Sequence, residues 1–160
     1  MTATPAEPVA AAAPVGPLTR GRKNALIAAI ILSGLLILGI WLAFLFAGHG
    51  VFGLNHHNLN VNKGGKKLDD QKVLDAHRAV GSILQIVSLL VLIAVGSARP
   101  GRRLVILTVV LALLIIIAQP LLAGIGADHS WVGGLHVLDA GIILILSFIV
   151  HLGLRKVPRA

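Results

Sequence analysis

The chain has 160 residues, of which 56% are hydrophobic and only 12% are charged, and its mean hydropathy is +0.91. These values exclude an ordinary soluble domain and predict a single all-α integral membrane domain. The chain has no cysteine, which excludes disulfides, thiolate ligands and iron–sulfur clusters. The net charge is +8, but the basic residues cluster at the ends of apolar segments, so we expect a lipid bilayer and no nucleic acid as partner.

Residues 1–19 are rich in Ala and Pro, and we expect them to form a disordered cytoplasmic tail. Four apolar segments follow, each close to the roughly 20 residues that a helix needs to cross a bilayer. They comprise residues 25–47, 74–95, 104–123 and 131–154. The first is too long for the apolar region of a secretory signal peptide, so we expect it to be retained. The sequence therefore predicts a four-helix transmembrane domain over residues 20–156 and a short cytoplasmic tail over residues 157–160.

Basic residues precede the first predicted helix, fill the second connection and follow the last helix. They are Arg20, Arg22 and Lys23, then Arg99, Arg102 and Arg103, then Arg155, Lys156 and Arg159. Because cytoplasmic loops are rich in Lys and Arg, we expect both termini to be cytoplasmic in a bacterial inner membrane. The longer first connection, residues 48–73, carries four lysines and the pair His56 and His57, and we expect it on the outer face.

Two predicted helices each carry a histidine near the outer end. His77 is followed four residues later by Gly81, and His136 is followed four residues later by Ala140. A serine stands eleven residues after each histidine, about three helical turns away, so histidine, small residue and serine share one face. If the two faces meet, they line a slot with two imidazoles. The alternative is that each histidine lies at the membrane interface.

The sequence Ala-Gly-His-Gly at residues 47–50 is echoed by Ala-Gly-Ile-Gly at residues 123–126, and each precedes a histidine-bearing helix. This echo predicts two parallel-repeated helical hairpins, which would bring the two histidines to equal depth. A low-spin b-type haem needs two axial nitrogens at one depth and helices that approach a flat macrocycle closely. We therefore predict one haem b with His77 and His136 as iron ligands, and His49 as a reserve ligand.

Several other polar residues fall within the predicted helices. Asp139 lies one turn below His136, and an acid in the membrane needs a partner, for which we expect Arg78 or a histidine ring N–H. We also expect Arg78 to neutralise the haem propionates. Gln119 precedes a proline, and its amide either bonds across the bundle or reaches a cofactor edge or a quinone oxygen. His151 has no histidine partner in the cytoplasmic half, so we expect it to be an interface residue.

At His77-Arg78 with Gly81, and at residues 134–136 with Ala140, the sequence resembles bacterial four-helix membrane proteins related to the cytochrome b four-helix superfamily. It is more distantly similar to haem A synthase, in which His-Arg pairs at helix ends ligate haem. The resemblance covers roughly residues 42–154. It implies that His77 and His136 are axial ligands. Haem A synthase has two such bundles and this chain has one, so the synthase activity does not follow.

The sequence therefore predicts a b-type cytochrome that transfers single electrons, with a quinone or a larger respiratory complex as partner. We expect an electron carrier or a subunit rather than a stand-alone enzyme. One alternative is a haem-free accessory subunit of a larger membrane complex. Another is a small proton-coupled transporter that uses Asp139, Arg78 and Gln119.

Overall fold

The computed structural model describes residues 18–60, 74–126 and 128–158, and these residues are all-helical. The helices are α1 (Arg20–Asn60), α2 (Asp75–Ala98), α3 (Arg102–Leu113), the π-helical segment η3 (Leu114–Ala118), α4 (Gln119–Gly126) and α5 (Ser130–Arg155). Because α3, η3 and α4 follow without a break, they form one continuous span.

Four segments in the described part of the chain are long and apolar enough to cross a bilayer. They are Arg20–Gly50, Asp75–Ala98, Arg102–Gly126 and Ser130–Arg155. The predicted all-α, four-helix transmembrane architecture is therefore confirmed, and the chain is a multi-pass membrane protein. The expected tail lies almost entirely outside the described residues, and so does the second half of the expected first connection, residues 61–73.

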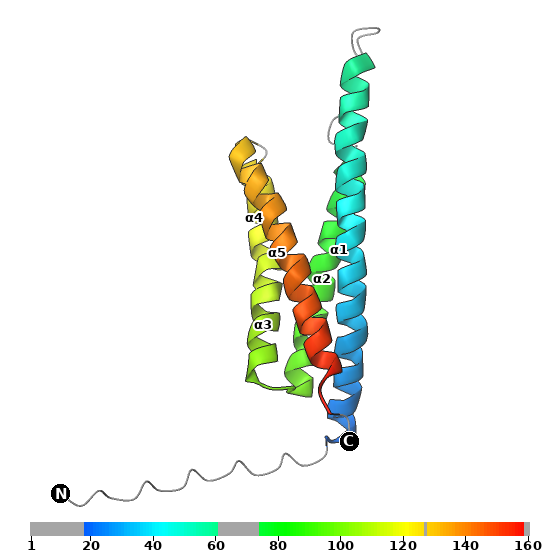
Figure 1. Cartoon of the computed structure of the whole chain (residues 1–160), viewed down its shortest axis with the longest axis vertical. Helices are drawn as coiled ribbons and strands as arrows, with labels where there is room; N and C mark the ends of the chain where they lie inside the picture. The colour runs from blue at the N-terminus through cyan, green and yellow to red at the C-terminus, as the bar shows by residue number, and fades with distance from the viewer. Residues whose placement is uncertain (1–17, 61–73, 127, 159–160) are drawn as a thin grey trace, which may run out of the picture.

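The four spans are arranged as two hairpins. One consists of α1 and α2, which lie side by side, and the other consists of the α3–α4 span and α5 (Figure 1). Helix α2 packs against α1 and α3, while α5 packs against α1, α3 and α4, so α2 and α5 occupy opposite corners of the bundle. The hairpins converge at one end and diverge at the other, where α4 contacts only η3 and α5 (Figure 1).

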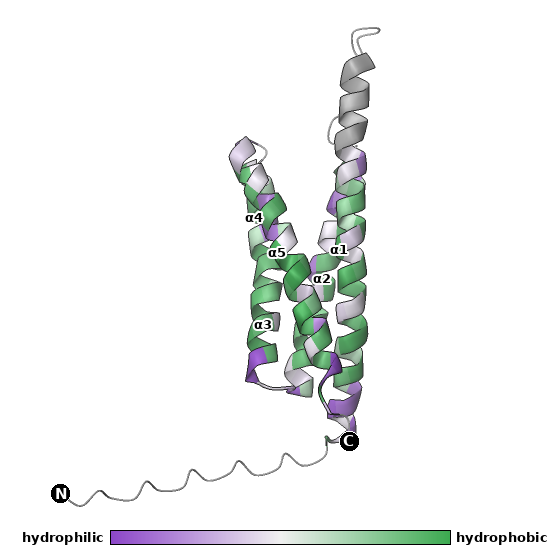
Figure 2. Cartoon of the chain, in the orientation of Figure 1, coloured by the Kyte–Doolittle hydropathy of each residue, from purple (hydrophilic) through white to green (hydrophobic). Residues whose placement is uncertain are grey.

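The two ends of the bundle differ in charge. We call the convergent end the basic end, because eight arginines and lysines of the described residues lie there; they are Arg20, Arg22, Lys23, Arg99, Arg102, Arg103, Arg155 and Lys156. The divergent end is called the histidine end, after His77 and His136. Figure 2 shows hydrophilic residues at the basic end and apolar residues along the spans between. Large apolar side chains such as Ile31, Leu45 and Ile86 are exposed on the outside of the bundle, as expected for a surface that faces lipid.

The buried core lies toward the basic end. Its apolar members include Leu26, Ala29, Leu36, Val91, Val95, Leu111, Val150 and Leu154, each no more than 1% exposed. The corresponding positions near the histidine end contribute few buried residues, and α4 contributes none. Tight packing of side chains therefore stabilises one end of the bundle more than the other.

Helix α1 continues far beyond the expected stop at residue 47. It runs through Gly48 and Gly50 to Asn60, so the predicted outer connection begins thirteen residues later than expected. Glycine in a helix interior lowers helix stability by only about 1 kcal/mol relative to alanine. Glycine typically ends a helix where its backbone adopts the left-handed conformation, with a positive φ angle. The only positive φ angles in the described chain belong to Arg99 and Gly101.

The turn between α2 and α3 is built from Arg99, Pro100 and Gly101. Arg99 ends α2 with φ 50° and ψ 56°, and its N–H donates to the Val95 carbonyl. Left-handed arginine is uncommon, and here the Arg22 guanidinium stabilises the turn. Its Nε donates to the Ala98 carbonyl at 3.1 Å and its Nη2 to the Arg99 carbonyl at 3.0 Å. The N-terminus of α1 is thereby fixed to the end of α2.

The third span contains one π-helical turn, η3, directly before Gln119 and Pro120. Proline has no N–H and leaves the carbonyl one turn earlier without its helical donor. The Gln119 N–H donates to the Leu114 carbonyl, five residues back, which is the hydrogen bond of a π turn. The turn keeps the span continuous and changes the face that Gln119 presents to α5.

Candidate functional site

His77 and His136 come together at the histidine end, from opposite corners of the bundle. Their ring centroids are 6.3 Å apart, and the ring planes are inclined at 79°. Both side chains are half-buried. Their approach bridges the two hairpins where the helices diverge, so the site lies between the hairpins rather than within one of them.

Each of the two rings is held by a backbone carbonyl of its own hairpin. His77 Nδ1 lies 2.9 Å from the Ala43 carbonyl oxygen on α1, and His136 Nδ1 lies 3.2 Å from the Gln119 carbonyl oxygen on α4. A carbonyl can only accept a hydrogen bond, so each Nδ1 carries a proton and donates it. In a neutral imidazole the other nitrogen, Nε2, then has a free lone pair. Both histidines therefore present the tautomer that ligates a metal through Nε2.

Gln119 links α4 to α5 around His136. Its side-chain Nε2 donates to the His136 backbone carbonyl at 3.1 Å and to Asp139 Oδ2 at 2.9 Å. The Gln119 backbone carbonyl accepts a hydrogen bond from the His136 ring. Asp139 is 8% exposed. The structure shows the Gln119 amide as a partner of Asp139, in addition to the Arg78 guanidinium or histidine ring N–H that the sequence led us to expect. Of the two roles considered for Gln119, the structure shows the bond across the bundle.

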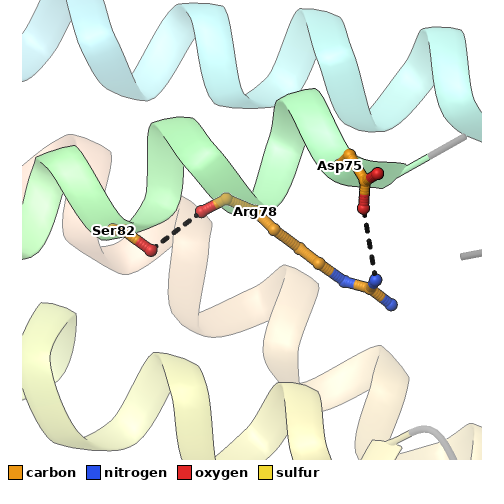
Figure 3. Close-up of polar contacts among 3 residues, drawn as sticks. All are labelled: Asp75, Arg78 and Ser82. Carbon is orange, nitrogen blue, oxygen red and sulfur yellow. Dashed lines mark hydrogen bonds and ion pairs between the residues drawn. The ribbon is translucent and has the colours of Figure 1, made fainter. Parts of the chain in front are cut away.

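Arg78 lies at the start of α2, next to His77 in the chain. Its Nη1 is 3.6 Å from Asp75 Oδ1, and both side chains are more than half exposed (Figure 3). Its backbone carbonyl accepts a hydrogen bond from Ser82 Oγ at 3.1 Å. The guanidinium thus lies at the outer margin of the site, where Asp75 orients it.

Several glycines of the histidine end adjoin open space. A Cβ added at Gly81 or Gly141, both half-buried, would meet no atom within 4 Å, and the same holds at Gly124 and Gly134, which are exposed. Ala140 is half-buried on α5. The open surroundings of glycines 124, 134 and 141 could not be predicted from the sequence, because neither their spacing nor their identity shows which neighbours a helix lacks.

The remaining histidines are distributed elsewhere. His49, the reserve ligand, is exposed on α1, and His129 is exposed before α5. His151, expected at the membrane interface, is half-buried: its Nδ1 lies 2.9 Å from Ser33 Oγ on α1, and its Cε1 packs over Gly34. His56 and His57 fall on the last turns of α1, and their side chains lie outside the described residues. The contact between Ser33 and His151 could not be predicted from the sequence, because a lone serine in a helix carries no pattern that indicates its hydrogen-bond partner.

The donor set at the site is two imidazole nitrogens. Nowhere in the described ranges do three His, Asp or Glu side chains gather in a way that could hold a metal ion. A structural zinc site needs four protein ligands, and a catalytic one usually has three. Two imidazoles from opposite sides instead match the two axial positions of a metal whose other four ligands come from a macrocycle.

Comparison with known proteins gives no relative on which to test this arrangement. No protein-family model, no curated protein and no solved structure matches the chain.

Proposed function

We propose that the chain is a membrane b-type cytochrome, related to the cytochrome b four-helix superfamily, in which His77 and His136 ligate one haem iron. The observation that carries the proposal is the pairing of these two rings across the bundle at 6.3 Å. Imidazoles on opposite sides of one metal ion, with bonds of about 2 Å each, have ring centroids roughly 6 Å apart. The distance between the two ring centroids thus matches the distance expected for two imidazoles that ligate one metal ion from opposite sides.

The surroundings of the pair support the same proposal. Both Nδ1–H groups are engaged by carbonyls, which leaves both Nε2 atoms for the iron. A macrocycle also needs space beside its ligands, and Gly81 and Gly141 have no neighbouring atoms where a side chain would otherwise project. A bound haem supplies one-electron chemistry, and the protein supplies ligands, burial and charge.

Residues around the ligands have separate tasks in this proposal. The Ala43 and Gln119 carbonyls fix the two ring orientations. Gln119 holds Asp139, so the buried carboxyl group has a hydrogen-bond donor. Arg78, with more than half of its side chain exposed, is the cation next to His77 for anionic propionate groups, in competition with Asp75.

The distribution of charge supports an orientation for the protein. The basic end would face the cytoplasm of a bacterium, with both termini on that side, and the haem would lie near the outer face of the inner membrane. A haem at that depth exchanges electrons with a quinone or with a larger respiratory complex in the same membrane. Electron transfer, rather than a stand-alone enzymatic reaction, is the proposed activity.

The test is the visible spectrum of detergent-purified protein from haem-replete cells, oxidised and dithionite-reduced. A reduced α band of a b-type haem, with one haem for each chain, is expected. It should be lost in His77→Ala and in His136→Ala and retained in His49→Ala, the matched control for the reserve ligand.

A colourless wild-type protein would overturn the proposal and favour the haem-free accessory subunit. A colourless protein that carries a proton-coupled flux, abolished by Asp139→Asn, would favour the transporter. Loss of the band in His49→Ala with retention in one of the other two variants would show that the ligand pair is wrong.

A further inference from the structure

A groove of about 400 Å³ lies between α3 and α5 at the basic end, far along the bundle from the histidine pair. Its walls are apolar and consist of Leu104, Leu107, Ile149 and Leu152. The volume lies within the roughly 300–1,000 Å³ of small-molecule sites. No part of the proposed haem site contributes to it, so it is a separate feature of the molecule.

Gly153, which also lines this groove, lets the two helices approach each other closely. A Cβ at Gly153 would lie 2.5 Å from Leu104 Cδ2, so the absence of a side chain lets Leu104 pack directly on α5. The groove thus lies where α3 and α5 pack closely, and its apolar lining is partly exposed on the outside of the bundle, most of all at Ile149 and Leu152.

Two cations stand at the groove, Arg103 from α3 and Lys156 from the end of α5. Both side chains are exposed. The acids that the structure describes, Asp75, Asp128 and Asp139, all belong to the other half of the bundle. By contrast, Arg22 at the same end donates to the carbonyls that end α2, so its charge already has a structural use.

An apolar groove that ends at two cations matches an anionic amphiphile. We propose that this groove binds an anionic phospholipid, with its phosphate between Arg103 and Lys156 and an acyl chain along the leucines. Basic pockets between spanning helices are favourable places for such headgroups, because attraction to the phosphate adds to burial of the chain. Free phosphate would use the two cations and leave the apolar walls without a role. This proposal stands whether or not the chain binds haem.

The test is native mass spectrometry of the full-length protein in detergent, with phosphatidylglycerol or phosphatidylcholine of the same acyl chains added. Preferential retention of one phosphatidylglycerol is expected. Each Lys or Arg near an anionic lipid contributes roughly a fivefold gain in affinity, so Arg103→Gln with Lys156→Gln should bind roughly 25-fold more weakly. The matched control is Arg20→Gln with Lys23→Gln, which removes the same charge from the same end outside the groove, and it should bind as the wild type does.

A second variant, Leu107→Trp, keeps every charge and fills the groove. It should also lose phosphatidylglycerol. Equal loss in the Arg20/Lys23 control would show a diffuse charge effect and overturn the proposal. Equal retention of the two lipids, unchanged binding by Leu107→Trp, or full displacement of the lipid by inorganic phosphate would overturn it as well.

Discussion

The basic end and the histidine end of the bundle can be compared through single glycines of their helices, whose surroundings differ from one position to the next. A Cβ at Gly34 would lie 3.6 Å from His151 Cε1 and one at Gly153 would lie 2.5 Å from Leu104 Cδ2, whereas one at Gly81 or Gly141 would meet nothing within 4 Å. Gly34 and Gly153 thus admit a neighbouring side chain, whereas Gly81 and Gly141 adjoin open space. The difference belongs to these positions and not to a whole end, because Gly96 at the basic end also meets nothing and Gly126 at the histidine end lies against Gly133.

The two ends are also held by different interactions. Buried apolar side chains pack the basic end, and the Arg22 guanidinium ties α1 to the end of α2 there. At the histidine end, hydrogen bonds to carbonyls orient two imidazoles, and Gln119 bonds to α5. One end is therefore held by apolar packing, and the other by hydrogen bonds that fix the orientation of polar side chains.

The largest expected effect concerns the packed end. Leu36 is 0% exposed on α1, and Leu36→Ala should destabilise the protein by about 2–5 kcal/mol because it leaves a cavity that the bundle cannot close. Leu38→Ala on the same helix, at a position that is 57% exposed, should cost less than about 1 kcal/mol. Denaturant unfolding in detergent micelles measures both. Equal losses would show that the core does not lie where α1 meets its neighbours.

The bond between Gln119 and Asp139 should have an intermediate effect. Gln119→Leu removes the donor of a buried carboxyl group and should cost about 1–3 kcal/mol of stability. Adding Asp139→Leu should recover part of this loss, because an unpaired polar group is no longer buried. The double-mutant cycle, measured by the same unfolding assay, gives the coupling energy. Additive losses would contradict a direct bond. Gln85→Leu, at the other glutamine of a described span, is the control.

The smallest expected effect compares two glycines of α5. Gly141→Ala should be neutral or stabilise the protein by up to about 1 kcal/mol, since alanine favours a helix and meets no neighbour. Gly153→Ala should destabilise it by about 1 kcal/mol, because Leu104 must move. The difference in thermal midpoint between the two variants is the measurement. A shift of the same sign and size in both would show that Gly141 and Gly153 do not differ in their surroundings.

Hydropathy and charge were sufficient to predict the four spans, because length and apolar content decide which segments cross a membrane. The end of α1 was not predictable in this way, since an isolated glycine such as Gly48 is tolerated in a continuing helix. The spacing of His77 and His136 with small residues correctly placed both rings on inward faces.

The bond between Gln119 and Asp139 could not be predicted from the sequence. A π turn adds one residue to a helical turn and shifts every later side chain by about 100° around the axis, and no sequence pattern reports that shift. Gln119 follows such a turn, and its amide and carbonyl both face α5. A sequence also does not show which backbone carbonyl a histidine ring will contact. The hydrogen bond between His77 Nδ1 and the Ala43 carbonyl could therefore be found only in the structure.

The central proposal is that His77 and His136 ligate the same iron, and electron paramagnetic resonance of the oxidised protein tests it most directly. We expect the wild type to give only a low-spin signal of a bis-imidazole haem. Each single variant, His77→Ala or His136→Ala, should convert any haem that it retains to a high-spin signal. A low-spin signal of undiminished intensity in either variant, at one haem for each chain, would contradict the shared iron.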